Sequence, residues 1–209
     1  MRRYPRPSIV GLLVAVVALA GCFQLKQPAP QISYYRLAYS SPTIAGAALP
    51  VTLQVVTLDV AALYDHEPIV YSDNPYSTGS YFYHRWSANP GSMVTDLLAR
   101  DFTSSGLYRA VQQQAAVLPP DYQLSGTLAS IEERASGRQC AAHLEIRVLV
   151  SRVRGPVADA VVMRQTYTAD DPCTCNDVRS LAEAMSHGLA GISERLQRDV
   201  YAAIAEGAG

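Results

Sequence analysis

The chain has 209 residues, of which 49% are hydrophobic, and its 17 basic and 18 acidic side chains give a formal net charge of −1. This length is sufficient for one domain with a sizeable hydrophobic core. The balanced charge and the lack of basic runs argue against nucleic acid or anionic headgroups as electrostatic partners.

The first 22 residues, MRRYPRPSIVGLLVAVVALAGC, have the pattern of an export signal. Three arginines precede an apolar run from Ile9 to Ala20, which is shorter than the roughly 20 residues of a membrane-spanning helix. The final LAGC matches the lipobox of bacterial lipoproteins. We therefore expect residues 1–21 to be a signal peptide and Cys22 to carry a diacylglycerol and an acyl chain. A secreted protein with a coincidental cysteine is the alternative.

Residues 22–32 are expected to form a lipidated tether, and residues 33–209 a single domain. The tether contains Pro28 and Pro30 and reaches roughly 30 Å at about 3 Å per residue. In Gram-negative lipoproteins, Asp directly after the lipidated cysteine favours retention in the inner membrane, and here that residue is Phe23. We therefore expect the periplasmic face of the outer membrane, with the inner membrane as the alternative.

In chain order, strand-like segments occupy residues 34–39 and 51–58, and 68–86 has the pattern strand, turn, strand. The last of these contains YFYHRW. Because side chains alternate along a strand, we interpret Phe82 and Trp86 as buried core, with His84 between them in need of a hydrogen-bond partner or a place near the sheet edge. The residues of the other face, together with Tyr76 in the preceding turn, form a candidate surface for a partner or for lipid (Tyr81, Tyr83 and Arg85).

A helix is predicted after this strand. Asn89 can cap it, Pro90 fits its first position, and Gly106 is a suitable stop. Its apolar stripe contains Val94, Leu97, Leu98 and Phe102. The next segments, LYRAVQ, YQLSGTLASIEERA and AHLEIRVLV, are predicted strands, of which the two longer ones alternate apolar and polar residues.

The last segment predicts a long amphipathic helix over about Asn176 to Ala205, since apolar residues recur every three or four positions. Gly188 and Gly191 inside it suggest either a close approach to the sheet or a slight bend. The predicted fold class is α+β: a mainly antiparallel or mixed sheet with two helices packed on one face, the second helix long and C-terminal.

Three cysteines remain in the mature chain, in a compartment that oxidises thiols. Residues 143–173 form a predicted hairpin that turns near Gly155 and Pro156, so Cys140 should face Cys173. We predict a disulfide between Cys140 and Cys173, with Cys175 as the alternative partner. A metal site on Cys173 and Cys175 lacks a nearby histidine and is disfavoured.

No sequence pattern of a known active site is found. A nucleophile elbow and a phosphate-binding loop are both missing. His66 and Glu67 begin like a zinc-protease motif, but the second histidine is absent and Pro68 would break the helix. His143 with Glu145, or His187, leaves a hydrolase as a weak alternative. We predict that the protein is not an enzyme and binds no cofactor other than its lipid.

The order of these features resembles the ABC-type transport auxiliary lipoprotein family. The similarity extends from the lipobox through SYYRLAYS, the Tyr-rich strand ending in Arg85 and Trp86, and SGLYRAV to the long C-terminal helix. Members of this family accompany lipid-transport systems built from an ABC permease, an ATPase and an MCE-domain protein. The resemblance carries no catalytic residues.

The resemblance implies a non-enzymatic lipoprotein that docks on an MCE-type conduit and helps phospholipids or related molecules cross the periplasm. Its expected partners are the MCE-domain protein with its permease and ATPase, and the membrane through the lipid anchor; a homo-oligomer is also compatible. The alternative is a structural or regulatory envelope lipoprotein that acts through protein contacts without transporting lipid.

Overall fold

The computed structural model describes residues 31–113, 119–154 and 160–207. The predicted signal peptide, Cys22 and nearly all of the tether lie outside these residues. Residues 32–209 form one compact unit. Within the described ranges, no helix combines the length and the apolar character needed to span a bilayer.

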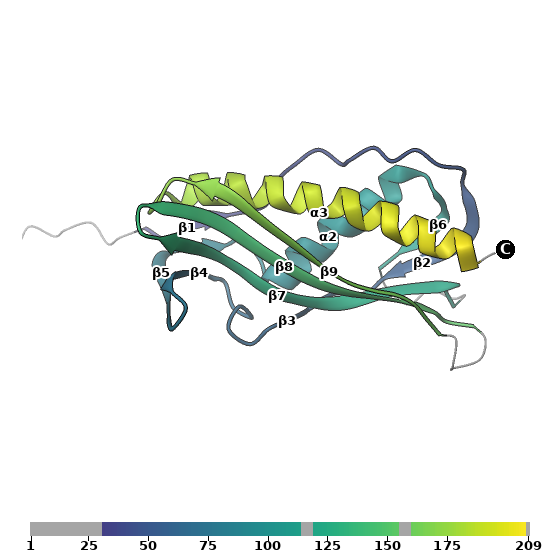
Figure 1. Cartoon of the computed structure of the whole chain (residues 1–209), viewed down its shortest axis with the longest axis horizontal. Helices are drawn as coiled ribbons and strands as arrows, with labels where there is room; N and C mark the ends of the chain where they lie inside the picture. The colour runs from purple at the N-terminus through teal and green to yellow at the C-terminus, as the bar shows by residue number, and fades with distance from the viewer. Residues whose placement is uncertain (1–30, 114–118, 155–159, 208–209) are drawn as a thin grey trace, which may run out of the picture. The chain divides into compact units, whose positions relative to one another are not determined.

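Nine strands and two helices are formed by the described residues (Figure 1). The N-terminal half contains β1 (Ser33–Tyr35), β2 (Leu49–Val55), β3 (Asp59–Val60), β4 (Pro68–Asn74), β5 (Ser77–Trp86) and α2 (Pro90–Ser105). The C-terminal half contains β6 (Tyr108–Gln112), β7 (Tyr122–Ser136), β8 (Gln139–Arg152), β9 (Val161–Cys173) and α3 (Val178–Gly207).

The long strand β7 organises a mixed sheet. Along one edge β7 pairs with β8, which in turn pairs with β9, and both pairings are antiparallel. Along its other edge it pairs in parallel with β2, β3 and β4 in succession, and β4 continues through the antiparallel β5 to the parallel β1. The far side of β2 pairs in parallel with β6. The three parallel partners of β7 follow one another directly in sequence.

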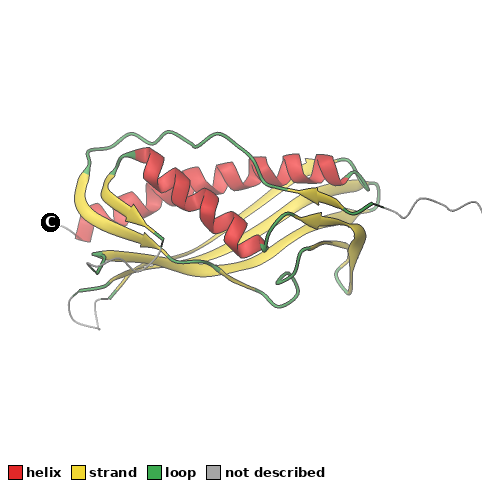
Figure 2. Cartoon of the chain, turned by 180° about the vertical axis from the view of Figure 1, so that it is seen from behind, coloured by secondary structure: helices red, strands yellow, loops and turns green. Residues whose placement is uncertain are grey.

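Both helices cover the same face of this sheet, as Figure 2 shows. The alternating residues of β8 supply that face, and their side chains are buried (Ala142, Leu144, Ile146, Val148 and Val150). The predicted stripe of α2 is buried at Val94, Leu98 and Phe102. Asn89 caps α2 by accepting from the Gly91 N–H at 2.9 Å, and Gly106 ends it at φ 66°. The predicted α+β fold is confirmed.

The two glycines of α3 differ in their surroundings. A Cβ on Gly188 would lie 3.0 Å from Ala169 Cβ and 2.7 Å from an Asp171 carboxylate oxygen, both on β9. A Cβ on Gly191 would meet nothing within 4 Å. The predicted close approach to the sheet is therefore found at Gly188 and not at Gly191.

The segment between β1 and β2 runs over the helices and is fixed to them through one buried carboxylate. Asp101 of α2 has no exposed surface. It accepts from Tyr39 Oη at 2.7 Å, Ser41 Oγ at 2.7 Å and Ser193 Oγ at 2.6 Å, and it pairs with Arg100 at 2.7 Å. A buried charge needs such complete satisfaction. Asp101 thus joins this segment, α2 and α3.

Candidate interaction surface

Strand β5 places the aromatic residues of YFYHRW differently from the alternating prediction. Trp86 is buried in the core, with 1% of its surface exposed, as predicted. Phe82 was expected beside it but is 78% exposed. The prediction that Phe82 and Trp86 are both core is therefore wrong at Phe82.

The cause is an irregularity in the pairing of β5 with β4. Val70 faces Ser80, whereas Pro68 faces Arg85, so two steps along β4 correspond to five along β5. The additional residues of β5 bulge out of the ladder, and a bulge interrupts the alternation of faces. Phe82, which lies inside this irregular segment, and Trp86, which lies beyond it, consequently need not share a face.

A chain of ring contacts crosses the three strands. The ring centroids of Tyr71 and Tyr81 are 5.0 Å apart, those of Tyr81 and His84 are 5.7 Å apart, and those of His84 and Tyr35 are 5.6 Å apart. Tyr35 Oη also lies 3.0 Å from His84 Nδ1. These distances are typical of favourable tilted or edge-to-face pairs. The contacts connect β4, β5 and β1 side by side.

Tyr81 is held by a buried acid. Its hydroxyl donates to Glu133 Oε2 at 2.6 Å, and Glu133 is 3% exposed. Partial burial, the hydrogen bond to Glu133 and the negative charge of that residue all raise the pKa of Tyr81. Of the four candidate contact residues, Tyr81 is thus the one whose hydroxyl is already occupied within the domain.

The exposed aromatic residues gather on this part of the sheet. Among the described residues, every aromatic side chain that belongs to the exposed large apolar set lies on β1, β4, β5 or the turn between the last two. We call these residues the aromatic edge: Tyr34, Tyr71, Tyr76, Phe82 and Tyr83. Tyr76, at the tip of the turn, is 97% exposed. The predicted contact residues Tyr76 and Tyr83 are both members of this set, and the sequence analysis did not name the other three (Tyr34, Tyr71 and Phe82).

Arg85, the fourth predicted contact residue, is half-buried beside this edge. Its guanidinium lies 3.8 Å from the Glu67 carboxylate. Tyr34 of β1 is its partner in the parallel ladder. Arg85 therefore borders the aromatic edge and is accessible there, although it also serves to hold the loop before β4.

The cysteines lie where β9 ends. Cys140 and Cys173 are partners in the β8–β9 ladder, so the predicted register is confirmed. The disulfide, however, joins Cys140 to Cys175, whose Cα atoms are 5.2 Å apart, and Cys173 is a free thiol. The predicted Cys140–Cys173 bridge is wrong because the chain turns back beyond Cys173, with Asn176 at φ 59°. Burial, followed by the charges of Glu133 and Asp177, raises the pKa of Cys173 to about 11.

This bridge also bears on the metal hypothesis. Glu133, Cys140 and Cys175 place potential ligand atoms close together. Both sulfur atoms are consumed in the disulfide, and a metal would need them as thiolates. The arrangement is therefore that of a structural crosslink between β8 and the turn that precedes α3.

The residues considered for hydrolysis are not arranged as a catalytic set in the described structure. His143 is buried, and its Nδ1 lies 2.7 Å from an Asp170 oxygen. Glu145 pairs with Arg147 at 2.8 Å. His187 lies exposed on α3. The hydrogen bond of His143 leads to a carboxylate and not to a hydroxyl or thiol that it could activate.

The sequence comparison decides the family. The model of the ABC-type transport auxiliary lipoprotein component matches residues 35–197, which is more than three quarters of the chain. The chain belongs to the ABC-type transport auxiliary lipoprotein family. The resemblance inferred from the sequence is thus confirmed. No curated protein matches the chain in sequence.

Solved structures share the fold of this auxiliary lipoprotein. A Xanthomonas campestris protein of the DUF330 family is 21% identical, with a TM-score of 0.75 over 84% of this chain and 98% of its own. An uncharacterised protein is 14% identical, with a TM-score of 0.64 over 81% and 99%. A hypothetical protein of Chlamydia trachomatis is 9% identical, with a TM-score of 0.51 over 73% and 96%. At these identities the likeness concerns the fold alone.

Proposed function

We propose that this auxiliary lipoprotein is anchored in the outer membrane through Cys22, faces the periplasm, and assists an ABC transporter of the MCE type. Its role is to dock the periplasmic end of the MCE conduit, so that phospholipids or other hydrophobic molecules pass between the membranes. The protein catalyses no reaction. The observation that carries this proposal is the family match over residues 35–197, directly downstream of a lipobox.

The sequence and the site are consistent with a docking role in which another subunit hydrolyses ATP. The chain has no phosphate-binding loop, so the energy of ATP hydrolysis would come from another subunit. Cys22 and the short tether would hold the domain near the lipid surface, and Phe23 in place of Asp favours the outer membrane. The described domain offers exposed aromatic residues for contact, whereas His143 and Glu145 are paired with Asp170 and Arg147.

The decisive experiment is a purification of the acylated protein from its own cell envelope after chemical crosslinking. We expect the MCE protein and its permease to be recovered with it, and deletion of the gene to disturb the distribution of phospholipids between the two membranes. If the protein brought down no MCE protein and lipid asymmetry stayed normal without it, a structural or regulatory role would replace the transport role.

The non-enzymatic part of the proposal has its own test. A gene that carries both His143→Gln and His187→Ala should complement the deletion strain as well as the unsubstituted gene does. Circular dichroism of the purified variant would verify that it folds. A folded variant that failed to complement would support a catalytic role for one of these histidines.

A further inference from the structure

The exposed rings of the aromatic edge suggest what the edge contacts. Tyrosine combines an apolar ring with a hydroxyl that remains in water, and such side chains are enriched at the boundary between hydrocarbon and headgroups. Four of the five members are tyrosines, and the fifth, Phe82, has 78% of its surface exposed. Arg85, at the border of the edge, carries a charge suited to the headgroup layer.

The edge is also the part of the domain next to the tether. Ile32, the first residue of the compact unit, is itself exposed, and Tyr34 follows it on β1. Ten residues separate Cys22 from Ile32, which limits the span to roughly 35 Å when fully extended. The aromatic edge would therefore lie close to any leaflet that holds the acyl chains.

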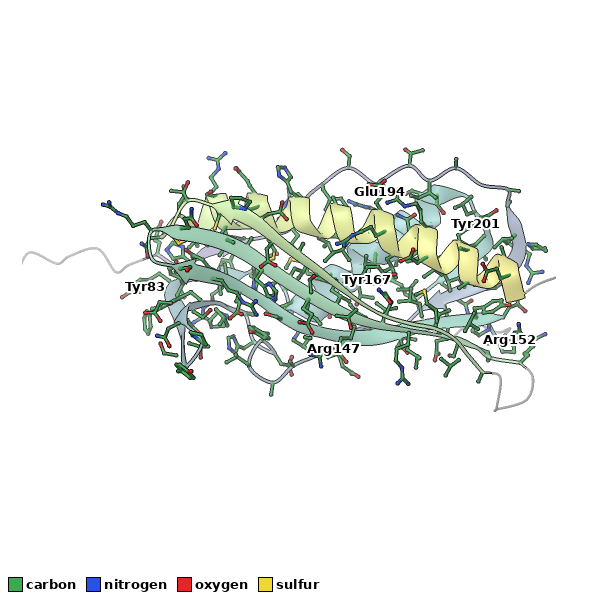
Figure 3. All side chains as sticks on the ribbon, viewed as in Figure 1. Tyr83, Arg147, Arg152, Tyr167, Glu194 and Tyr201 are labelled. Carbon is green, nitrogen blue, oxygen red and sulfur yellow. A yellow bond between two sulfur atoms is a disulfide. The ribbon has the colours of Figure 1, made fainter. Side chains whose placement is uncertain are left out.

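The other end of the sheet is much farther from this point. β4 pairs with β7 at Glu132, whereas Arg152 pairs with β7 at Tyr122, ten residues away. At about 3.3 Å per residue, the two positions are roughly 30 Å apart. Figure 3 shows the same separation, with Tyr83 at one end of the domain and Arg152 and Tyr201 toward the other. Val161, which pairs with Ser151, is an exposed apolar residue at that distant end.

We propose that the aromatic edge inserts into the interfacial layer of the phospholipid leaflet that carries the lipid anchor, so that this edge of the domain faces the membrane. The proposal rests on the acylation of Cys22, which is part of the proposed function. Contact through five side chains adds a second attachment to the acyl chains and fixes which end of the domain faces the periplasm. An acyl anchor by itself would not determine the orientation of the domain.

The test uses tryptophan as a probe of depth in the acylated full-length protein. The chain has one tryptophan, Trp86, which is 1% exposed and serves as a constant background. Phe82→Trp and Tyr76→Trp place probes on the edge, and Val161→Trp is the matched control at the distant end. Each protein is reconstituted into phosphatidylethanolamine and phosphatidylglycerol vesicles with or without brominated acyl chains, which quench tryptophan on contact.

We expect the two edge probes to shift to the blue on reconstitution and to lose at least about half of their added emission to the brominated lipid. Val161→Trp and the unsubstituted protein should show little quenching. Equal quenching of Val161→Trp, or no quenching of the edge probes, would overturn the proposal. A blue shift of the edge probes that required a second copy of the chain or an MCE protein, without quenching by lipid, would also overturn it in favour of a protein interface.

Mass spectrometry of the vesicle samples, together with the crosslinking experiment on the same variants in the cell envelope, separates this inference from the proposed function. If Cys22 is acylated and the protein still recovers the MCE protein, unquenched edge probes refute the inserted edge alone. If Cys22 carries no lipid, the anchor itself is refuted.

Discussion

At the scale of single residues, the three cysteines show how a correct register can give a wrong bridge. Cys140 and Cys173 are ladder partners, yet Cys175 holds the bond to Cys140. In Cys175→Ser we expect Cys140 to pair with Cys173, because their Cα atoms are already opposed across the ladder. Non-reducing peptide mapping would detect the new crosslink.

The control variants for this prediction are Cys173→Ser and Cys140→Ser. Cys173→Ser should keep the native bridge. Cys140→Ser removes both possible bridges, and loss of a crosslink across 35 residues should lower the free energy of unfolding by about 3 to 4 kcal/mol. Cys175→Ser should lose clearly less. A free Cys140 thiol in Cys175→Ser would contradict the prediction.

Tyr81 provides a second test at this scale. Tyr81→Phe removes the donor to Glu133, whose carboxylate is buried and would then keep, among the described residues, only the Asn176 N–H at 3.4 Å. We expect the free energy of unfolding to fall by about 1 to 3 kcal/mol, the usual range for a buried group left short of a partner. Tyr83→Phe, on the exposed edge, should change it by less than about 0.5 kcal/mol. Urea denaturation measures both values, and equal effects would show that the hydrogen bond is unimportant.

At the scale of elements, the two glycines of α3 form a natural pair. Alanine is favoured over glycine inside a helix by up to about 1 kcal/mol. Gly191→Ala should gain most of this, since its Cβ would meet nothing within 4 Å. Gly188→Ala should be no more stable than the unsubstituted protein, or less stable, because its Cβ would lie only 3.0 Å from Ala169 Cβ of β9. The unfolding temperatures of the two variants give the comparison. If Gly188→Ala were as stable as Gly191→Ala, β9 would be able to shift and accommodate the added methyl group at little cost.

Elements whose ends are fixed by local chemistry were predicted well. Asn89, Pro90 and Gly106 mark the limits of α2 because capping and left-handed backbone preferences act within a few residues. The register of β8 with β9 followed from one turn. The bulge in β5 could not be predicted in this way, since it depends on pairing with β4 and on the core beneath Trp86. The exposure of Phe82, and with it the full extent of the aromatic edge, therefore required the structure.

At the scale of the whole domain, buried tyrosines make stability sensitive to high pH. Burial raises the pKa of five tyrosines in the folded domain (Tyr39, Tyr64, Tyr81, Tyr108 and Tyr167). Ionised phenolates are disfavoured in the folded state, whereas the unfolded chain releases these protons near pH 10. Between that pH and the raised values, the folded state holds more protons. The stability that these protonated tyrosines contribute is therefore fully present below about pH 10, and it is lost as the pH rises further.

We expect the free energy of unfolding to fall with a slope equivalent to about four protons at about pH 11, which is roughly 5 kcal/mol per pH unit. Urea titrations at increasing pH measure the slope, and near-ultraviolet absorbance follows the phenolates directly. Tyr167→Phe should reduce the slope by about one proton, because it removes one of these groups. Tyr76→Phe should leave it unchanged, because Tyr76 is 97% exposed and titrates alike in both states. A stability independent of pH up to about pH 11 would mean that these rings already ionise freely in the folded domain.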